Sequence, residues 1–329
     1  MNCDYLDKWD LWPFFYVYRL GLAGPGAPGD TLLRVGLPIQ GDADFLWRAL
    51  QIDMMQPKPA NLTDFIGANP SSPFVQDTTT GARQVGWYAF QKRIYLPSDV
   101  AIHSGFTLSG AGDLEGMIPA NVSNEGNACY PQPIIPEVLL LRSSSLSIDL
   151  QNLTNLGVFA PPDSSLALEI CLRVVKLIPK GSIYKIDRTK KYVALPAVYS
   201  VPFPSTVAGT YTKGVGVRLE SSTEFVLYSV DCDAQNTGFQ ATVYGARGER
   251  TSSLNQLGPL SLASGGNAFG LVSRGNLCGT ARFPGVFCPP LEYPPGGNII
   301  FDFYAPNNYT PQNANAQLIF RGAKLYRVQ

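Results

Sequence analysis

The chain has 329 residues, of which 45% are hydrophobic and 11% aromatic, enough to build two separate cores. Charged residues make up only 15%, and 25 Lys and Arg balance 25 Asp and Glu, so the formal net charge is zero. This balance argues against a nucleic-acid-binding protein, which carries an excess of basic residues. It also leaves little charge repulsion to keep copies of the chain apart.

The turn residues predict an all-β protein. The 32 glycines and 27 prolines follow no period and lie among many β-branched and aromatic residues. The N-terminus is acidic, and the apolar run at 11–18 is short and contains Pro13, so neither a secretory signal nor a membrane span is predicted. We therefore expect synthesis in the cytoplasm without a membrane anchor.

Residues 1–19 are predicted to form an N-terminal arm, because aromatic residues are crowded within them. One interpretation is a strand packed on its own domain. The other is contact with a neighbouring subunit, because aromatic residues are enriched at the cores of interfaces. On the second interpretation, removing the arm would leave the domains folded and impair association. The candidate partner contacts are Trp9, Trp12, Phe14, Phe15 and Tyr16.

An internal repeat is the strongest pattern in the chain. Residues 44–53 (DFLWRALQID) recur 180 residues later (224 − 44 = 180) as 224–233 (EFVLYSVDCD). Each copy has an acid, a Phe, a run of apolar residues and a closing Asp. The first copy alone resembles a helix, but the strand-like composition of the second predicts a strand for both.

Three further matches follow the same order along the chain. They pair 35–37 with 215–217, 146–149 with 299–302, and 170–177 with 318–325. The offset falls from 180 to 148 (318 − 170), so the first copy is longer by 32 residues (180 − 148). Long loops predicted at 54–86 and 103–133 account for this difference, and loops of that kind are often functional.

The repeat predicts two tandem jelly-roll-like β-sandwich domains of roughly eight strands each, produced by internal duplication. The first domain is predicted at 20–179 and the second at 194–329. A basic linker at 180–193 joins them. The stretch 176–191 carries six basic residues, and a solvated linker is preferred over contact with an acidic surface.

Residues with catalytic potential are few. The single histidine, His103, lies beside a predicted loop without a nucleophile motif around it. The acid pairs Asp231 with Asp233 and Asp113 with Glu115 match neither a Ca²⁺ loop nor the facing acids of a glycoside hydrolase. We predict no enzyme, no catalytic, cofactor-binding or metal-binding residues, and no cofactor. Four aromatic residues could line a carbohydrate platform, although core packing is the simpler explanation for them. They are Trp47, Trp87, Tyr88 and Tyr95.

The six cysteines form no CxxC pair. Cys171 and Cys232 lie in apolar strand patterns and are predicted to be buried thiols. Cys129, Cys278 and Cys288 are assigned to loops, and the sequence leaves open whether they form disulfides within or between chains.

The repeated motifs resemble structural proteins of tailed bacteriophages. In that family similar β units open with [AS]-D-[AS]-[DE]-F and end in a G-x-K-[LV]-[YF] strand. Here Asp42-Ala43-Asp44-Phe45 matches the opening, with Gly41 just before it, and Gly322-Ala323-Lys324-Leu325-Tyr326 matches the ending. The resemblance spans about residues 31–328 and implies a component of the virion.

The leading hypothesis is a non-enzymatic bacteriophage virion protein associated with the capsid, as shell, decoration (cement) or vertex component. It implies a homo-oligomer that contacts itself, the major capsid protein or both, with neither a membrane nor a specific nucleic acid as partner. Within this class, a double jelly-roll major capsid protein is the alternative. Outside it, the alternative is a receptor- or glycan-binding module of a tail or baseplate.

Overall fold

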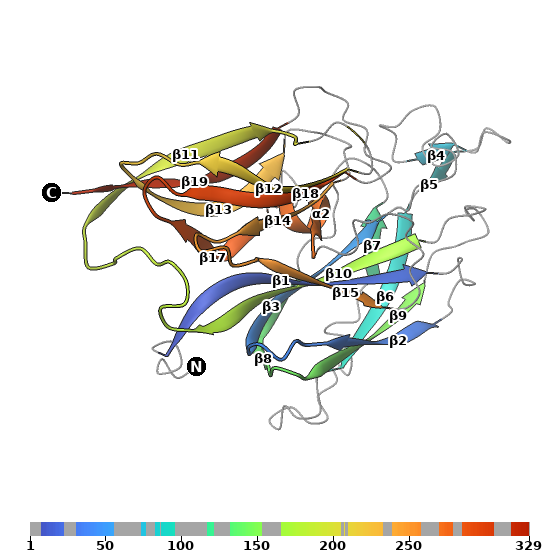
Figure 1. The fold of residues 1–329 in the computed structure, drawn as a ribbon. Coiled ribbons are helices and arrows are strands. Elements are labelled where there is room, and N and C mark those ends of the chain that lie inside the picture. The colour runs from blue at the N-terminus through green and yellow to red at the C-terminus, as the bar shows by residue number, and fades with distance from the viewer. Residues whose placement is uncertain are drawn as a thin grey trace. The chain divides into compact units, whose positions relative to one another are not determined.

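The computed structural model of the chain describes residues 8–22, 31–55, 74–76, 83–85, 87–95, 117–121, 132–152, 166–204, 207, 210–232, 239–257, 270–278, 285–305 and 317–328. In these ranges the regular structure is strand, apart from the short helix α2 (Arg274–Cys278) (Figure 1). The predicted all-β class is therefore confirmed. The loops expected at 54–86 and 103–133 lie mostly outside the described residues, as do His103, Asp113, Glu115, Cys129 and Asp233.

The strands of the described residues fall into two sets of eight, and three further strands belong to neither set. The first strand set is β1 (Trp9–Leu22), β2 (Thr31–Pro38), β3 (Phe45–Met55), β6 (Trp87–Tyr95), β7 (Met117–Asn121), β8 (Gln132–Leu140), β9 (Ser145–Asn152) and β10 (Leu166–Pro179). The second strand set is β11 (Tyr192–Pro202), β12 (Tyr211–Arg218), β13 (Glu224–Cys232), β14 (Gln240–Tyr244), β16 (Val272–Ser273), β17 (Val286–Tyr293), β18 (Asn298–Tyr304) and β19 (Gln317–Arg327). The other strands are β4 (Phe74–Gln76), β5 (Arg83–Val85) and β15 (Ser252–Leu257).

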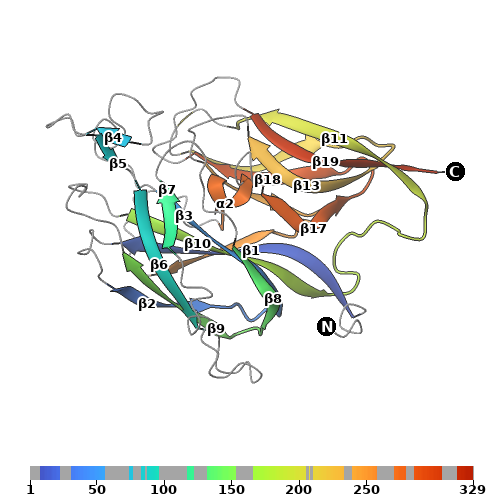
Figure 2. The same ribbon diagram turned by 180° about the vertical axis from the view of Figure 1, so that it is seen from behind.

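Both strand sets have the same order of strands in their sheets. The first forms the sheets β15-β1-β10-β3-β8 and β2-β9-β6-β7, and the second forms β11-β19-β13-β17 and β12-β18-β14-β16. Figure 2 shows β11, β19 and β13 neighbouring one another from behind. Counted along the chain within each set, one sheet joins the first, eighth, third and sixth strands, and the other joins the second, seventh, fourth and fifth. This is the order of an eight-stranded jelly roll.

The register of strand pairing also repeats. Val35 pairs with Ile148 on β9, and Val215 pairs with Phe301 on β18, which are 180 (215 − 35) and 153 (301 − 148) residues further on. These are the offsets at which 35–37 and 146–149 recur in the sequence, since 299 − 146 is also 153. Phe45 pairs with Leu140 and Phe225 with Tyr293, again 180 and 153 apart.

Even the irregularity of this pairing recurs. On β3 the register shifts between Trp47 and Ala49, whose partners on β8 are Val138 and Pro133. On β13 it shifts between Leu227 and Ser229, whose partners on β17 are Leu291 and Val286. In both cases two steps along the third strand correspond to five along the sixth.

The chain divides into two compact units. One comprises Met1–Val17, Arg173–Leu254 and Ser264–Gln329, and the other comprises Tyr18–Leu172 and Asn255–Ala263. Both β1 and β10 therefore contribute residues to both units. The division places the described residues before Tyr18 with the second strand set, whereas the sequence suggested a separate arm. The structure does not confirm such an arm, because residues 9–22 form β1 of a sheet.

Aromatic rings fill the core of the second strand set. Phe203, Phe239 and Phe303 lie with ring centroids 5.3–5.4 Å apart, and Phe301 of β18 meets Phe320 of β19 at 5.4 Å. Such contacts stabilise beyond the area they bury. All five rings are buried. Phe301 and Phe303 are alternate residues of β18 and therefore point to the same face of its sheet.

The segment predicted as a basic linker keeps its basic side chains exposed and buries two apolar ones, Ile183 and Ile186. Ile186 is buried with Val226 and Leu325, and its backbone N–H donates to the Glu292 carboxylate at 2.5 Å. The other oxygen of Glu292 accepts from Arg188, also at 2.5 Å. Since Glu292 is itself buried, these donors satisfy a charge that would otherwise be costly there.

Candidate functional site

The predicted partner contacts lie on β1. Trp9 is half-buried, and the other four side chains, Trp12, Phe14, Phe15 and Tyr16, are buried. The Trp12 indole N–H donates to the Arg250 carbonyl at 2.9 Å. The aromatic rings therefore already have partners in the chain itself, and their role in contact with another molecule stays a prediction.

Two cations and one more ring hold these aromatics. The Arg173 guanidinium lies 5.2 Å from the centre of the Phe15 ring, and the Lys176 ammonium lies 5.3 Å from that of Phe14. The Phe15 ring also meets Phe287 edge-on at 5.8 Å. Cation–π contacts of this kind stabilise by about 0.5–2 kcal/mol each, depending on burial. Lys176, predicted to belong to a solvated basic stretch, thus has a packing role.

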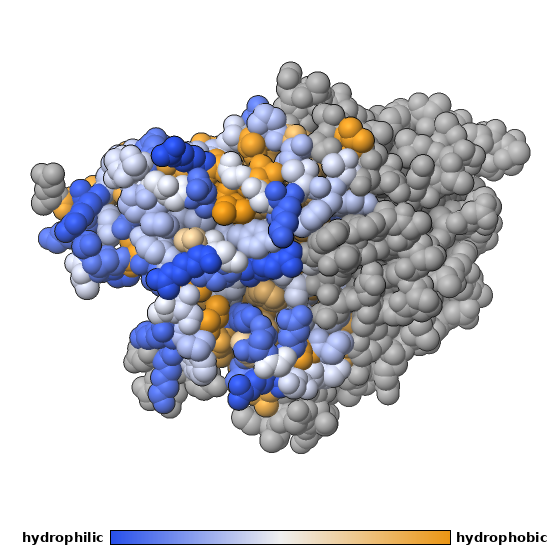
Figure 3. All heavy atoms as spheres, in the orientation of Figure 1, coloured by the Kyte–Doolittle hydropathy of each residue, from blue (hydrophilic) through white to orange (hydrophobic). Residues whose placement is uncertain are grey.

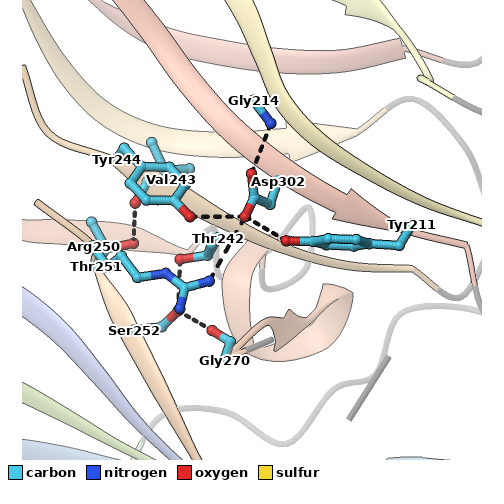
Figure 4. Close-up of polar contacts among 10 residues, drawn as sticks. All are labelled: Tyr211, Gly214, Thr242, Val243, Tyr244, Arg250, Thr251, Ser252, Gly270 and Asp302. Atoms are coloured by element: carbon cyan, nitrogen blue, oxygen red, sulfur yellow. Dashed lines mark hydrogen bonds and ion pairs between the residues drawn. The ribbon is translucent and has the colours of Figure 1, made fainter. Parts of the chain in front are cut away.

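A buried carboxylate, Asp302, organises the outer side of β18 (Figure 4). One oxygen accepts from the hydroxyls of Tyr211 at 2.7 Å and Tyr244 at 2.8 Å, with the Arg250 guanidinium at 3.7 Å. The other oxygen accepts from the backbone N–H of Gly214 at 2.8 Å. Burial and the hydrogen bond to Asp302 raise the pKa of both tyrosines.

This network is built for stability. Donors of β12, β14 and the turn at Arg250 surround the carboxylate, so both of its oxygens have hydrogen-bond partners. The groups in contact with Asp302 are two hydroxyls, a backbone amide and a guanidinium. A glycoside hydrolase requires a second acid that faces the first across the substrate. The sequence contained a signal for Asp302, since it stands as the one charge in an apolar strand and matches Asp149.

Residues 251 and 252 extend the network along β14. The Thr251 hydroxyl donates to the Val243 carbonyl at 2.8 Å. The Ser252 hydroxyl donates to the Gly270 carbonyl at 2.5 Å and accepts from Thr242 at 2.6 Å (Figure 4). Each buried hydroxyl in this row is therefore hydrogen-bonded, as a stable core requires.

The free edge of β11 is the most unusual part of the described surface. The strand has eleven residues without a charge, and its apolar side chains Val193, Leu195 and Val198 are 51%, 49% and 57% exposed. Figure 3 shows hydrophobic residues among polar ones over the region of β11 and β12. Proteins normally protect a long edge strand with charges, because its unpaired backbone groups invite another strand. Of the usual devices β11 has only the prolines Pro196 and Pro202.

The matching strand of the first set has a covered edge. β1 and β11 are both first strands, and each lies beside the eighth strand of its set. On its other side β1 has β15, and Phe15 N donates to the Thr251 carbonyl at 2.8 Å just before β15 begins. Among the described strands β11 has β19 as its only neighbour. The two equivalent edges thus differ in whether an added strand covers them.

The cysteines differ in part from expectation. Cys171 is a buried cysteine outside any disulfide, as predicted, and Cys232 is a half-buried one. Cys278 and Cys288 are also outside any disulfide, but they lie in α2 and β17, so their assignment to loops was wrong. Both segments are short and irregular in composition, which is why the sequence suggested loops.

Two further candidate residues, Trp47 and Asp231, have partners within the chain. Trp47 is fully buried and its indole donates to the Ala49 carbonyl at 2.9 Å, so it belongs to the core and not to a carbohydrate platform. Asp231 pairs with Arg321 at 3.1 Å on the surface. In the described part of the chain, no cluster of three or more His, Cys, Asp or Glu residues suits a metal ion. Nor does a helix there have the length and apolar character needed to cross a membrane.

Comparison with known proteins gives little. No family model and no curated protein matches the chain. Among solved structures, that of the Macrobrachium rosenbergii nodavirus has 10% identity and a TM-score of 0.23 over 97% of this chain and 90% of the other. The T=1 Penaeus vannamei nodavirus structure has 12% identity and a TM-score of 0.22 over 96% and 98%. At such low scores neither likeness indicates a shared function.

Proposed function

We propose that this chain is a non-enzymatic structural protein of a virion and that it acts by self-association of β-sandwiches. The observation that carries the proposal is the pair of strand sets with one jelly-roll order and one register. Jelly rolls occur in viral shells, in lectins and in cupins, so the fold alone leaves several functions open.

Internal duplication explains the two sets best. All four sequence matches fall on strands of equal rank: the second, third, seventh and eighth of each set. The offsets of 180 and 153 then recur in the pairing of backbone residues, which convergence of two unrelated sandwiches would not require. A chain that repeats a sandwich presents two similar surfaces to its neighbours, which suits a shell of many copies.

The near-neutral charge and the β11 edge favour self-association over binding of a charged partner. An uncharged edge of eleven residues offers backbone hydrogen bonds to an added strand and exposed apolar side chains around it. The covered edge of β1 shows the same position accepting a strand within this chain. We therefore assign the β11 edge to a strand of a second copy.

The phage origin rests on the sequence resemblance alone. A double jelly-roll major capsid protein and a decoration or vertex protein are both compatible with the proposal. The receptor- or glycan-binding alternative is weakened because Trp47, one of its four proposed platform aromatics, is buried.

The β11 assignment is tested by two matched pairs of lysine substitutions. V193K with V198K charges the β11 edge, and Y228K with V286K changes side chains of similar exposure, 44% and 47%, on β13 and β17 of the same sheet. Light scattering after size-exclusion chromatography measures association of the full chain. We expect oligomers of the native chain and of the control, and at least about tenfold weaker association of the β11 variant.

Three results would contradict this assignment: a native chain that stays monomeric at high concentration, equal loss in both variants, or no loss in the β11 variant. Circular dichroism shows whether each variant keeps its strands. The virion role is tested separately, by the position and copy number of the chain in a particle.

A further inference from the structure

Two thiols that lie far apart in the sequence meet at one end of the second strand set. Cys232 is the last residue of β13, and Cys278 is the last residue of α2, 46 residues later (278 − 232). Their sulfur atoms share a hydrogen bond. Cys232 is half-buried, whereas Cys278 is buried at 3% exposure. Cys232 is thus the more exposed of the two residues, and Cys278 is shielded from solvent.

Three backbone contacts fix the position of α2. The Arg274 N–H donates to the Phe239 carbonyl at 2.8 Å, and the Cys278 carbonyl accepts from Gly285 at 2.7 Å. In the middle, the Arg173 guanidinium donates to the Asn276 carbonyl at 2.7 Å. A Cβ atom at Gly285 would lie 2.0 Å from the Leu277 carbonyl oxygen, so glycine is required there. The meeting of the two thiols is therefore built into the fold.

The charges around Cys232 favour its ionised form. The Arg274 guanidinium Nε donates to Cys232 Sγ at 3.1 Å. The neighbouring carboxylate of Asp231 opposes this effect, but its oxygen is paired with Arg321 at 3.1 Å. The hydrogen bond from Cys278 and the positive charge of Arg274 together lower the pKa of Cys232 to about 7, and the same hydrogen bond and burial raise that of Cys278.

The two cysteines therefore have different chemical characters. A thiolate and not a thiol is the nucleophile, and a nearby Arg is one of the features that make a cysteine reactive. A second thiol in contact with it is the usual arrangement of a redox-responsive pair. The two other described cysteines differ from Cys232 in exposure. Cys171 is buried in β10, and Cys288 is exposed on β17.

We propose that Cys232 and Cys278 form a peroxide-responsive pair, in which Cys232 is the attacking thiolate and Cys278 the resolving thiol. The Cys232 sulfur attacks hydrogen peroxide, an S–O bond forms, the O–O bond breaks and hydroxide leaves. The Cys278 thiol then gives up its proton and attacks Cys232, so that an S–S bond forms, the S–O bond breaks and water leaves. The two thiols lose two electrons and the peroxide gains them.

The disulfide would join the end of β13 to α2. It closes a loop of 46 residues (278 − 232), and a cross-link of that length restricts the unfolded chain. We expect the oxidised protein to have a Tm about 5–10 °C above that of the reduced protein. This inference is independent of the proposed virion role and holds for any function of the chain.

The test uses hydrogen peroxide on the full-length folded protein, followed by mass spectrometry without reduction. We expect a loss of two hydrogen atoms and a peptide pair linked through Cys232 and Cys278. In Cys278→Ser, we expect a sulfenic acid at Cys232 that dimedone traps. In Cys232→Ser, oxidation of Cys278 falls about tenfold or more, because the buried thiol lacks its reactive partner.

Arg274→Gln and Cys288→Ser complete the set. Removing the Arg274 charge should slow oxidation about fivefold at neutral pH, and the rate should recover in alkaline buffer. The Cys288→Ser variant should form the Cys232–Cys278 disulfide at the native rate. The proposal is overturned if the linked peptides are absent, if Cys288 is needed for the reaction, or if Cys232→Ser leaves Cys278 equally reactive. If the Arg274→Gln variant does not fold, the native protein supplies the test. An oxidation rate of the native protein that does not change between about pH 6 and 8 then overturns the proposal.

Discussion

The two strand sets agree in their interior and differ at their edges. Both join their strands in one order, and both carry the same register shift between the third and sixth strands. At the outer side of the first strand, β1 has β15 as a neighbour, whereas β11 has none among the described strands. The comparison indicates that strand order and register are common to the two sets, and that the sets differ where a strand ends a sheet.

The largest effect is expected from deleting residues 1–19. The sequence suggested that both sandwiches would survive this deletion, but it removes most of β1 and buried rings including Trp12, Phe15 and Tyr16. Burial of each such side chain contributes about 1.5–3 kcal/mol, so the loss approaches the whole stability of a typical domain. We expect an insoluble or unfolded chain by circular dichroism. A soluble chain with native strand content would instead support the interpretation of residues 1–19 as a separate arm.

The next largest effect should come from Asp302→Ala. It leaves the Tyr211 and Tyr244 hydroxyls and the Gly214 amide without their acceptor, at a cost of about 3 kcal/mol in the free energy of unfolding. Asp231→Ala, which breaks a partly exposed ion pair with Arg321, serves as the control and should cost under about 1 kcal/mol. Urea denaturation measures both, and equal losses would mean that Asp302 is not the centre of a buried network.

Gly322→Ala tests a position at which the two strand sets differ. A Cβ atom there would lie 2.1 Å from the Val226 carbonyl oxygen and 2.4 Å from the Phe225 ring, whereas the sequence match places Val174 at the corresponding position of the first strand set. We expect a loss of about 1–3 kcal/mol from this crowding. Gly216→Ala, where a Cβ meets nothing within 4 Å, is the matched control and should change stability little. If Gly322→Ala is as stable as its control, the close approach does not explain the glycine of the G-x-K-[LV]-[YF] motif.

The smallest effect concerns rate and not stability. Since the thiolate reacts and the pKa of Cys232 is lowered to about 7, oxidation by peroxide should quicken as pH rises through about 7 and then level off. Arg274→Gln should move this midpoint upward, because the thiolate loses a neighbouring positive charge. Stopped-flow measurement across this range gives the midpoint, and an unchanged midpoint in the variant would show that Arg274 does not stabilise the thiolate.

Much of the fold was predictable from the repeat. The helix-like run at 45–53 was assigned correctly to a strand because its match at 225–233 is rich in β-formers, and 45–53 and 225–232 lie on the third strands of their sets. The buried thiol of Cys171 followed from the apolar pattern around it. Internal comparison supplied the long-range information that a single segment lacks.

The remaining features depend on contacts that local sequence does not encode. The aromatic crowding at 9–18 is compatible with a strand or an arm, and only pairing with other strands decides between them. The contact between the exposed Arg188 and the buried Glu292 could not be predicted, because the two residues are 104 positions apart. The Cys232–Cys278 pair has no motif, since its geometry comes from the position of α2. The eleven uncharged residues of β11 can be read from the sequence, but the position of β11 at the end of a sheet of the described strands cannot.

Electron microscopy of the particle that contains this chain tests the central claim most directly. We expect each chain to contribute two jelly rolls to the shell, at many copies, with a strand of a neighbouring copy along the β11 edge. Finding the protein in a few copies at a tail tip, or outside the particle altogether, would contradict the proposed function.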